Sequence, residues 1–145
     1  MKLINNRIDE TIKQHAIFLK VFSDEQLSHA RIIRESIEES GKIFLALYLE
    51  FRNACILFLS EEAERLGTLA VSIPVRGPLR QQFTSSVLLG ERDILAARLL
   101  AEKLANLTGK IALVSVSTRT ISQAGVAQTL LRLMEKVLAK REELR

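Results

Sequence analysis

The most informative stretch of this sequence runs Ile43-Phe44-Leu45-Ala46-Leu47-Tyr48-Leu49-Glu50-Phe51, breaks at Arg52-Asn53, and resumes as Ala54-Cys55-Ile56-Leu57-Phe58-Leu59-Ser60. We interpret it as two antiparallel strands joined by a tight hairpin. Odd positions from 43 to 51 are apolar, but positions 44, 46 and 48 between them are apolar or aromatic as well. A sheet with one solvent-exposed face alternates cleanly, whereas a sheet covered on both faces need not. Helices can cover one face, so we expect a second copy of this chain, or a paralogue, to cover the other.

The composition is that of an ordinary globular domain. A length of 145 residues suits a single domain, and the fractions of 48% apolar and 26% charged residues are typical. Arg52 and Asn53 interrupt the longest apolar run, which therefore falls short of the roughly 18 residues that a membrane span needs. The segment Met1–Arg7 lacks the apolar centre of a secretory signal. We therefore expect a cytoplasmic protein.

The single cysteine and the charge distribution give two further expectations. Cys55 has no partner for an internal disulfide, and we expect it to be a small buried residue. Residues 24–64 hold four basic and nine acidic side chains, whereas residues 65–145 hold thirteen basic and six acidic ones. This asymmetry favours oriented docking on a charged partner, although scattered solvated residues would give the same count.

The remaining elements follow from periodicity and from turn signals. We expect residues 1–11 to be loosely ordered and residues 12–145 to form one domain. Ile12–Phe22 alternates like a strand. Ser23 to Gln26 has capping-box spacing, which predicts the start of a helix that ends near Gly41. Ile32-Ile33 could equally begin an extended segment. Residues 66–75 would be the third strand of a meander, and further strands are expected at 83–89 and 111–116, with helices at 93–107, capped by Asp93, and 122–143.

This order predicts an α+β fold. We expect a single, mostly antiparallel sheet of about five to six strands with two to three helices. In a dimer, two such sheets would pack face to face.

The sequence offers little catalytic chemistry. His15 and His29 have no ligand partner at metal-binding spacing, and no phosphate-binding loop or nucleophile elbow is present. Glu61, Glu62 and Glu64 are best explained as solubilising turn residues. Ser115–Ser122 joins a strand to a helix, where either an anion or an N-cap by Thr120 or Ser122 could satisfy the free N–H groups. We therefore expect no catalytic residue, no cofactor and no metal.

Nucleic-acid binding is the alternative that a basic chain invites. The loop residues Arg65, Arg76, Arg80 and Arg119 could contact phosphates. Only one aromatic residue, Phe83, lies among them for base stacking. A small basic dimer that binds DNA or RNA therefore remains an alternative hypothesis.

One ordered set of segments in the second half resembles a known family. Gly67-Thr68-Leu69-Ala70-Val71-Ser72-Ile73-Pro74 leads to Ser86-Val87-Leu88-Leu89-Gly90-Glu91-Arg92-Asp93, then to Ala101-Glu102-Lys103-Leu104, and then to Ile111-Ala112-Leu113-Val114-Ser115-Val116. This order is similar to that of the proteasome assembly chaperones, in particular their third and fourth members. The resemblance covers about residues 43–140.

The resemblance implies a function as well as a fold. Members of that family are small non-enzymatic α+β proteins that form homo- or heterodimers through their sheets, bind α subunits of the 20S core particle and promote α-ring assembly. Two departures are visible: residues 23–41 are longer than the family's first connection, and Arg141–Arg145 does not match the hydrophobic-tyrosine tail of other proteasome chaperones. The only tyrosine, Tyr48, lies in a predicted strand. Docking is therefore expected to use a folded surface.

Two sets of residues are our candidates for binding. The partner-binding candidates are the loop arginines Arg65, Arg76, Arg80 and Arg119. The dimer-interface candidates are the strand residues Leu45, Leu47, Leu49, Phe58, Leu69 and Val71.

Overall fold

The computed structural model describes residues 2–21, 30–75, 77, 84–119 and 124–145. Its contacts divide the chain into two compact units, residues 1–31 and residues 32–145. Each unit is described by itself below.

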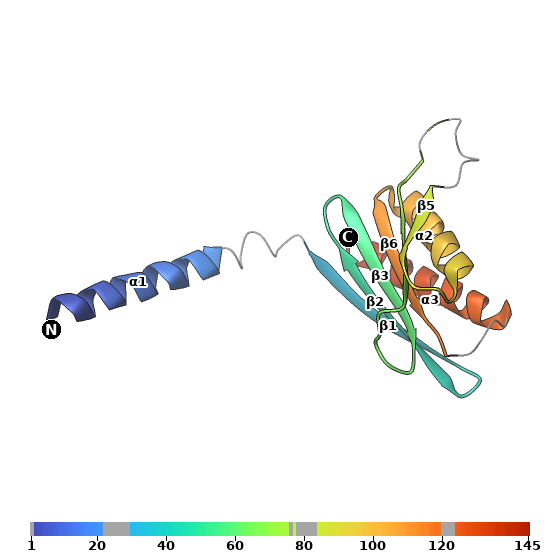
Figure 1. Ribbon diagram of the computed structural model, residues 1–145, viewed down its shortest axis with the longest axis horizontal. Helices are drawn as coiled ribbons and strands as arrows, with labels where there is room; N and C mark the ends of the chain where they lie inside the picture. The colour runs from blue at the N-terminus through green and yellow to red at the C-terminus, as the bar shows by residue number, and fades with distance from the viewer. Residues whose placement is uncertain (1, 22–29, 76, 78–83, 120–123) are drawn as a thin grey trace. The chain divides into compact units, whose positions relative to one another are not determined.

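In the first unit, Lys2–Val21 forms one helix, α1 (Figure 1). The predicted strand is therefore wrong over residues 12–21, and residues 2–11 belong to the same helix. Ile4, Ile8 and Ile12 recur every four residues and so share one helical face, while Asn6 and Lys13 lie on the opposite face. The apolar residues between Ala16 and Phe22 also fit the two-residue period of a strand, and the strand prediction therefore missed the helical period of about 3.6 residues.

The second unit is an α+β domain, as predicted. Its elements in chain order are β1 (Arg31–Glu39), β2 (Lys42–Glu50), β3 (Ala54–Glu61), β4 (Thr68–Ser72), β5 (Ser85–Leu89), α2 (Ile94–Thr108), β6 (Ile111–Ser117) and α3 (Ala124–Glu143). The helix predicted from Ser23 to Gly41 is wrong over residues 31–39, which form β1. The alternative of an extended segment at Ile32-Ile33 is the one that the structure adopts, and residues 24–29 lie outside the described part.

The turn between β1 and β2 is formed by Ser40 and Gly41, which both have positive φ angles, 53° and 76°. Two such residues form the tight turn that suits a hairpin.

The six strands form one sheet in the order β1-β2-β3-β6-β4-β5. The β2–β3, β4–β6 and β4–β5 pairs are antiparallel, whereas β3 and β6 are parallel. The predicted meander is wrong at one place, because β6 lies between β3 and β4. Leu113 and Val114 on opposite faces of β6 are both apolar, and a strand of this kind is favoured at the centre of a sheet.

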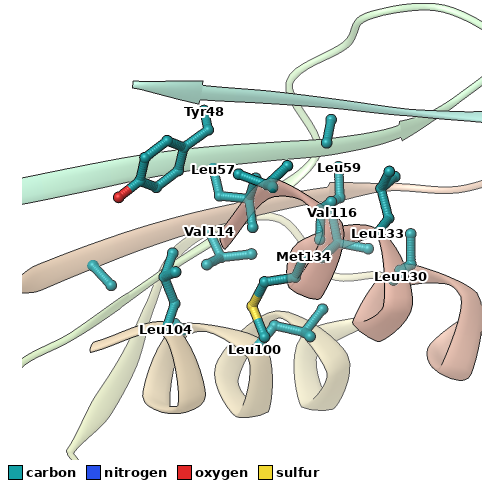
Figure 2. Packing of buried hydrophobic residues seen from close by; sticks show 14 of the residues in the cluster. Tyr48, Leu57, Leu59, Leu100, Leu104, Val114, Val116, Leu130, Leu133 and Met134 are labelled. Carbon is teal, nitrogen blue, oxygen red and sulfur yellow. The ribbon is translucent and has the colours of Figure 1, made fainter. Parts of the chain in front are cut away.

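Helices α2 and α3 pack on one face of the sheet and enclose the core (Figures 1 and 2). Leu57 and Val114 project from the sheet toward Leu104 of α2 and Met134 of α3, and all four are fully buried. Cys55 is also fully buried, as predicted.

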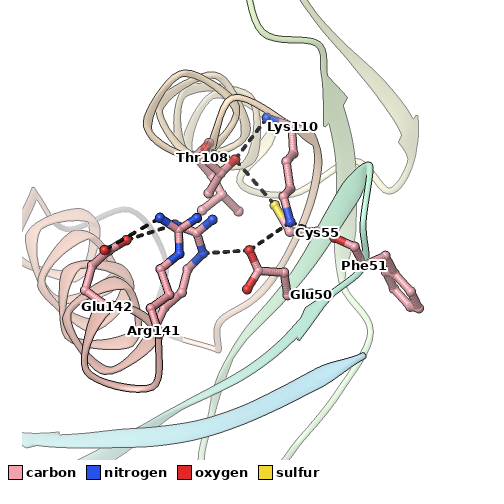
Figure 3. A network of polar contacts seen from close by, with 9 residues as sticks. Glu50, Phe51, Cys55, Thr108, Lys110, Arg141 and Glu142 are labelled. Atoms are coloured by element: carbon pink, nitrogen blue, oxygen red, sulfur yellow. Dashed lines mark hydrogen bonds and ion pairs between the residues drawn. The ribbon is translucent and has the colours of Figure 1, made fainter. Parts of the chain in front are cut away.

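A charged network ties the end of β2 to α3 (Figure 3). The Glu50 carboxylate accepts hydrogen bonds from Lys110 Nζ at 3.0 Å and from Arg141 Nε at 2.7 Å. Glu50 and Arg141 are both buried, at 6% and 4% exposure. Lys110 Nζ also donates to the carbonyl of Phe51 at 2.7 Å, which fixes the turn after β2.

Candidate interaction surface

The sheet has a second face, which points away from α2 and α3. In β2 the even-numbered residues from Phe44 to Glu50 are buried against the helices, while the odd-numbered ones are partly or fully exposed. The same alternation continues through β3, β6 and β4. We call this surface the open face; its apolar members include Ile43, Leu45, Leu47, Leu49, Ile56, Phe58, Leu69, Val71, Ile73, Ile111 and Leu113.

The open face is large and apolar. Leu47 lies opposite Phe58 across β2 and β3, and Leu113 lies opposite Val71 across β6 and β4, so the apolar side chains run across neighbouring strands. Ile43 is 49% exposed and Ile73 is 56% exposed. Within the described part of residues 32–145, neither helix packs on this face. A contiguous apolar surface of this kind marks an interaction site.

The structure brings all six predicted dimer-interface residues together on the open face. Leu45, Leu47 and Leu49 lie on β2, Phe58 on β3, and Leu69 and Val71 on β4. Successive side chains of a strand point to opposite faces of the sheet, and this rule alone was sufficient to predict that these residues share one face. Their role in a dimer remains a prediction.

The predicted partner-binding arginines are only partly placed. Arg76 and Arg80 lie outside the described residues. Arg65 is exposed in the loop between β3 and β4, and Arg119 follows β6, so both lie at the edge where β3 and β6 end. The Arg119 guanidinium pairs with Glu62 at 3.3 Å. The role of these arginines also remains a prediction.

Glu61 is a structural residue that the sequence analysis misassigned. Its side chain is buried and pairs with Lys42 at 3.2 Å, and it accepts a hydrogen bond from the Arg119 backbone N–H at 2.9 Å. Only Glu62 and Glu64 are exposed, as a solubilising role requires. Glu61 is the last residue of β3, directly after the run that begins at Ala54 and ends at Ser60, and this closeness to an apolar strand could have indicated that its side chain is buried.

The segments that carried the family resemblance meet in space. A Cβ atom at Gly67 would lie 2.0 Å from the Val116 carbonyl oxygen, and one at Gly90 would lie 2.5 Å from the Thr68 hydroxyl. Gly90 also has a φ of 96°, which side chains rarely tolerate. The Thr68 hydroxyl donates a hydrogen bond to the Arg92 carbonyl. Both glycines therefore permit close approach of neighbouring backbone.

Asp93 occupies the N-cap position of α2, as predicted, but it does not cap the helix through its side chain. Its carboxylate instead accepts a hydrogen bond from the Thr118 hydroxyl at 2.8 Å. This contact ties the start of α2 to the end of β6.

The described residues have few groups suited to catalysis. Among them, no cluster of three or more His, Cys, Asp or Glu side chains could hold a metal ion. Burial raises the pKa of the Cys55 thiol, while hydrogen bonds to Thr108 and Tyr48 oppose the shift less strongly. A thiol with a raised pKa is a poor nucleophile. His15 is exposed on α1, whereas His29, Thr120 and Ser122 lie outside the described residues.

The helices that the structure describes include none with the length and apolar character of a membrane span.

Comparison with known proteins gives a likeness of fold. No family model matches the sequence, and no curated protein does. Among solved structures, the chain is similar to a chain in the crystal structure of a novel chaperone complex for yeast 20S proteasome assembly, with a TM-score of 0.50 and 16% sequence identity. The match covers 79% of this chain and 94% of that chain.

Proposed function

We propose that this protein is a non-enzymatic proteasome assembly chaperone that binds α subunits of the 20S core particle and promotes formation of the α ring. The fold that it shares with the yeast assembly chaperone supports this proposal, as do the family-like segments around Gly67 and Gly90. We propose a cytoplasmic location on the same grounds.

The observation that carries the proposal is the open face. An enzyme would need a pocket with convergent titratable groups, whereas a chaperone needs surfaces for other proteins. Six strands spaced by about 4.8 Å give a sheet about 24 Å across, and a single helix is only about 10–12 Å wide. A second sheet fits this face better than a helix does. We therefore propose that the chain forms a dimer, with itself or with a paralogous chaperone, through paired open faces.

The direct test is co-purification. The tagged full-length protein should capture free proteasome α subunits and should be absent from finished 20S particles, because an assembly chaperone leaves the completed product. Stoichiometric retention on mature particles, or failure to bind any α subunit, would contradict the proposal.

The partner-binding arginines can be tested in the same assay. The charge reversals Arg65→Glu and the pair Arg76→Glu with Arg80→Glu should weaken α-subunit capture, because charges at the rim of an interface steer docking. Arg52→Glu is the matched control, since Arg52 is exposed in the β2–β3 turn, at the opposite end of β3 from Arg65. Unchanged capture by the arginine variants would remove these residues from the interface.

A further inference from the structure

The open face is not flat, because the loop between β3 and β4 crosses one end of it. Strand β6 lies between β3 and β4, so residues 62–67, which we call the crossing loop, have to pass β6. The Gly67 N–H donates a hydrogen bond to the Ser115 hydroxyl at 2.9 Å. Ser115 lies on the open-face side of β6, between the helix-facing residues Val114 and Val116. The crossing loop therefore passes β6 on the open face.

Two further observations place the crossing loop over this end of the sheet. The Glu64 carboxylate lies 3.9 Å from the Arg34 guanidinium, and Arg34 belongs to the open-face side of β1, since Ile33 before it is buried against the helices. Ser60 lies on the open-face side of β3 and is buried, although neither α2 nor α3 packs there. The crossing loop thus raises one end of the open face, which we call the raised end.

The raised end and the opposite end, which we call the low end, both expose apolar side chains. Leu66 is the one large apolar residue of the crossing loop, and it is 59% exposed. At the low end, Ile111 begins β6 and is 38% exposed. Ile73 lies beside it, because Ser72 pairs with Ala112, and Ile73 is more exposed still. Each molecule therefore carries an apolar projection and an uncovered apolar area on the same face.

This shape restricts how two open faces can meet. Packed sheets lie about 10 Å apart, which leaves room for one loop between them but not for two stacked loops. A two-fold axis parallel to the strands would bring the two raised ends together and hold the low ends apart. A two-fold axis across the strands brings each raised end over the low end of the other molecule. A flat sheet of another protein would rest on the crossing loop and leave the low end unfilled.

We propose that two copies of this chain pair with their strands running in opposite directions, so that Leu66 of each packs against Ile73 and Ile111 of the other. This pairing rests on the open-face dimer proposed above, and it specifies both the partner and the strand direction. A second copy is the fitting occupant because a two-fold interface requires a surface that is complementary to itself. The open face meets this requirement, since it carries the raised end and the low end together.

Disulfide cross-linking between two variants of the full-length protein tests this pairing. Leu66→Cys and Ile111→Cys, carrying tags of different size, are mixed, allowed to exchange subunits and mildly oxidised. Mixing prevents a bridge between the two added cysteines within one chain, and the native Cys55 is fully buried. A covalent dimer with one chain of each variant is expected. Leu66→Cys mixed with Leu107→Cys is the matched control and should lack this product, because Leu107 is an exposed leucine of α2 rather than of the open face.

Each of the other outcomes would overturn the pairing. A covalent dimer of Leu66→Cys with itself would show that the raised ends meet, and equal cross-linking to Leu107→Cys would indicate random collision. Absence of the mixed product, when sedimentation equilibrium shows that the variants still form a dimer, would overturn the pairing and leave the open-face dimer standing. A wild-type protein that is monomeric in the same measurement would overturn both.

The dissociation constant of the dimer provides a second test that needs no added cysteine. Leu66→Ala should raise it at least about 10-fold, because each molecule loses the burial of a leucine side chain. Leu95→Ala is the matched control and should leave it unchanged, since Leu95 is an exposed leucine of α2. Equal dissociation constants for the wild type and Leu66→Ala would overturn the role of the crossing loop.

Discussion

At the scale of single residues, the Glu50 network is the clearest source of stability that sequence reasoning did not anticipate. Glu50 lies in an apolar strand and looked like an exception to its pattern. Its explanation comes from Lys110 and Arg141, which are 60 and 91 residues away in the sequence. Local periodicity cannot reveal a partner at that distance.

Glu50→Gln should lower the free energy of unfolding by about 3 kcal/mol, because it removes the counter-charge of the buried Arg141. Glu142→Gln is the matched control, since Glu142 pairs with the same arginine at 3.1 Å but is largely exposed. An exposed pair of this kind contributes at most about 1 kcal/mol. Urea unfolding at pH 7 measures both changes. Equal effects of the two substitutions would show that burial of Glu50 has no special role.

The same network predicts a pH dependence. Burial raises the pKa of Glu50, but hydrogen bonds from Lys110 and Arg141, together with their charges, outweigh burial and lower the pKa below its ordinary value of 4.5. Because the folded-state pKa is the lower one, the stabilisation is complete above pH 4.5 and is lost as pH falls through the folded-state pKa. The stability difference between the wild type and Glu50→Gln should therefore shrink in urea titrations at acidic pH, and a constant difference would contradict this assignment.

The two close-packed glycines give a second prediction at this scale. Gly67→Ala and Gly90→Ala should each lower the unfolding free energy by about 1–3 kcal/mol, because the new methyl group would meet neighbouring backbone or the Thr68 side chain. Gly125→Ala is the control, since the added methyl group would meet nothing within 4 Å beyond its chain neighbours and the backbone of its own helix. In helix α3 this substitution should be neutral or stabilising by up to about 1 kcal/mol. Chemical denaturation would compare the three variants, and a loss at Gly125 as large as at Gly67 would argue against steric contact as the cause.

At the scale of secondary-structure elements, the elements from β2 to α3 were predicted well, whereas the predictions were wrong for residues 12–21 of α1 and for β1. The hairpin of β2 and β3, the strands β4, β5 and β6 and the helices α2 and α3 lie close to their predicted positions, because short apolar runs bounded by turn residues mark the strands and apolar residues at helical spacing mark the helices. Between Ile12 and Phe22, a dense apolar run satisfies both the strand and the helix period. In β1, the buried residue Ile33 follows the apolar Ile32, and their adjacency fits a helix as well as a strand.

The β1–β2 turn offers a prediction for an element boundary. Ser40 has a φ of 53°, which is unfavourable for serine and well tolerated by asparagine. Ser40→Asn should therefore raise the unfolding free energy by about 0.5–1 kcal/mol, since Asn-Gly is the preferred pair in such turns. Ser86→Asn serves as the control, because Ser86 is an exposed strand residue of β5 where asparagine has no such advantage. Thermal unfolding distinguishes them, and a similar gain at Ser86 would rule out the turn as the cause.

At the scale of the whole molecule, the sequence anticipated the two-sided apolar character of the sheet but not its topology. The grouping of Leu47, Phe58 and Val71 on one face follows from strand alternation, which is a local property. The insertion of β6 between β3 and β4 is a long-range property, since residues 111–117 pair with residues 54–60 in parallel. The contact between Glu61 and Arg119 depends on this insertion and was therefore also missed.

The open face provides the prediction on which the proposed dimer depends. Leu47→Glu should convert the dimer to a monomer, with a dissociation constant raised at least about 100-fold, because a carboxylate would be buried without a partner between two apolar sheets. The fold itself should survive, since Leu47 points away from the core that α2 and α3 enclose. Leu107→Glu is the control, because Leu107 is also an apolar leucine outside the core, more exposed than Leu47, but it lies in the last turn of α2. Sedimentation equilibrium over a range of concentrations measures the dissociation constants. A wild-type protein that remains monomeric at high concentration, and does not associate with a paralogous chaperone, would mean that the open face serves another partner.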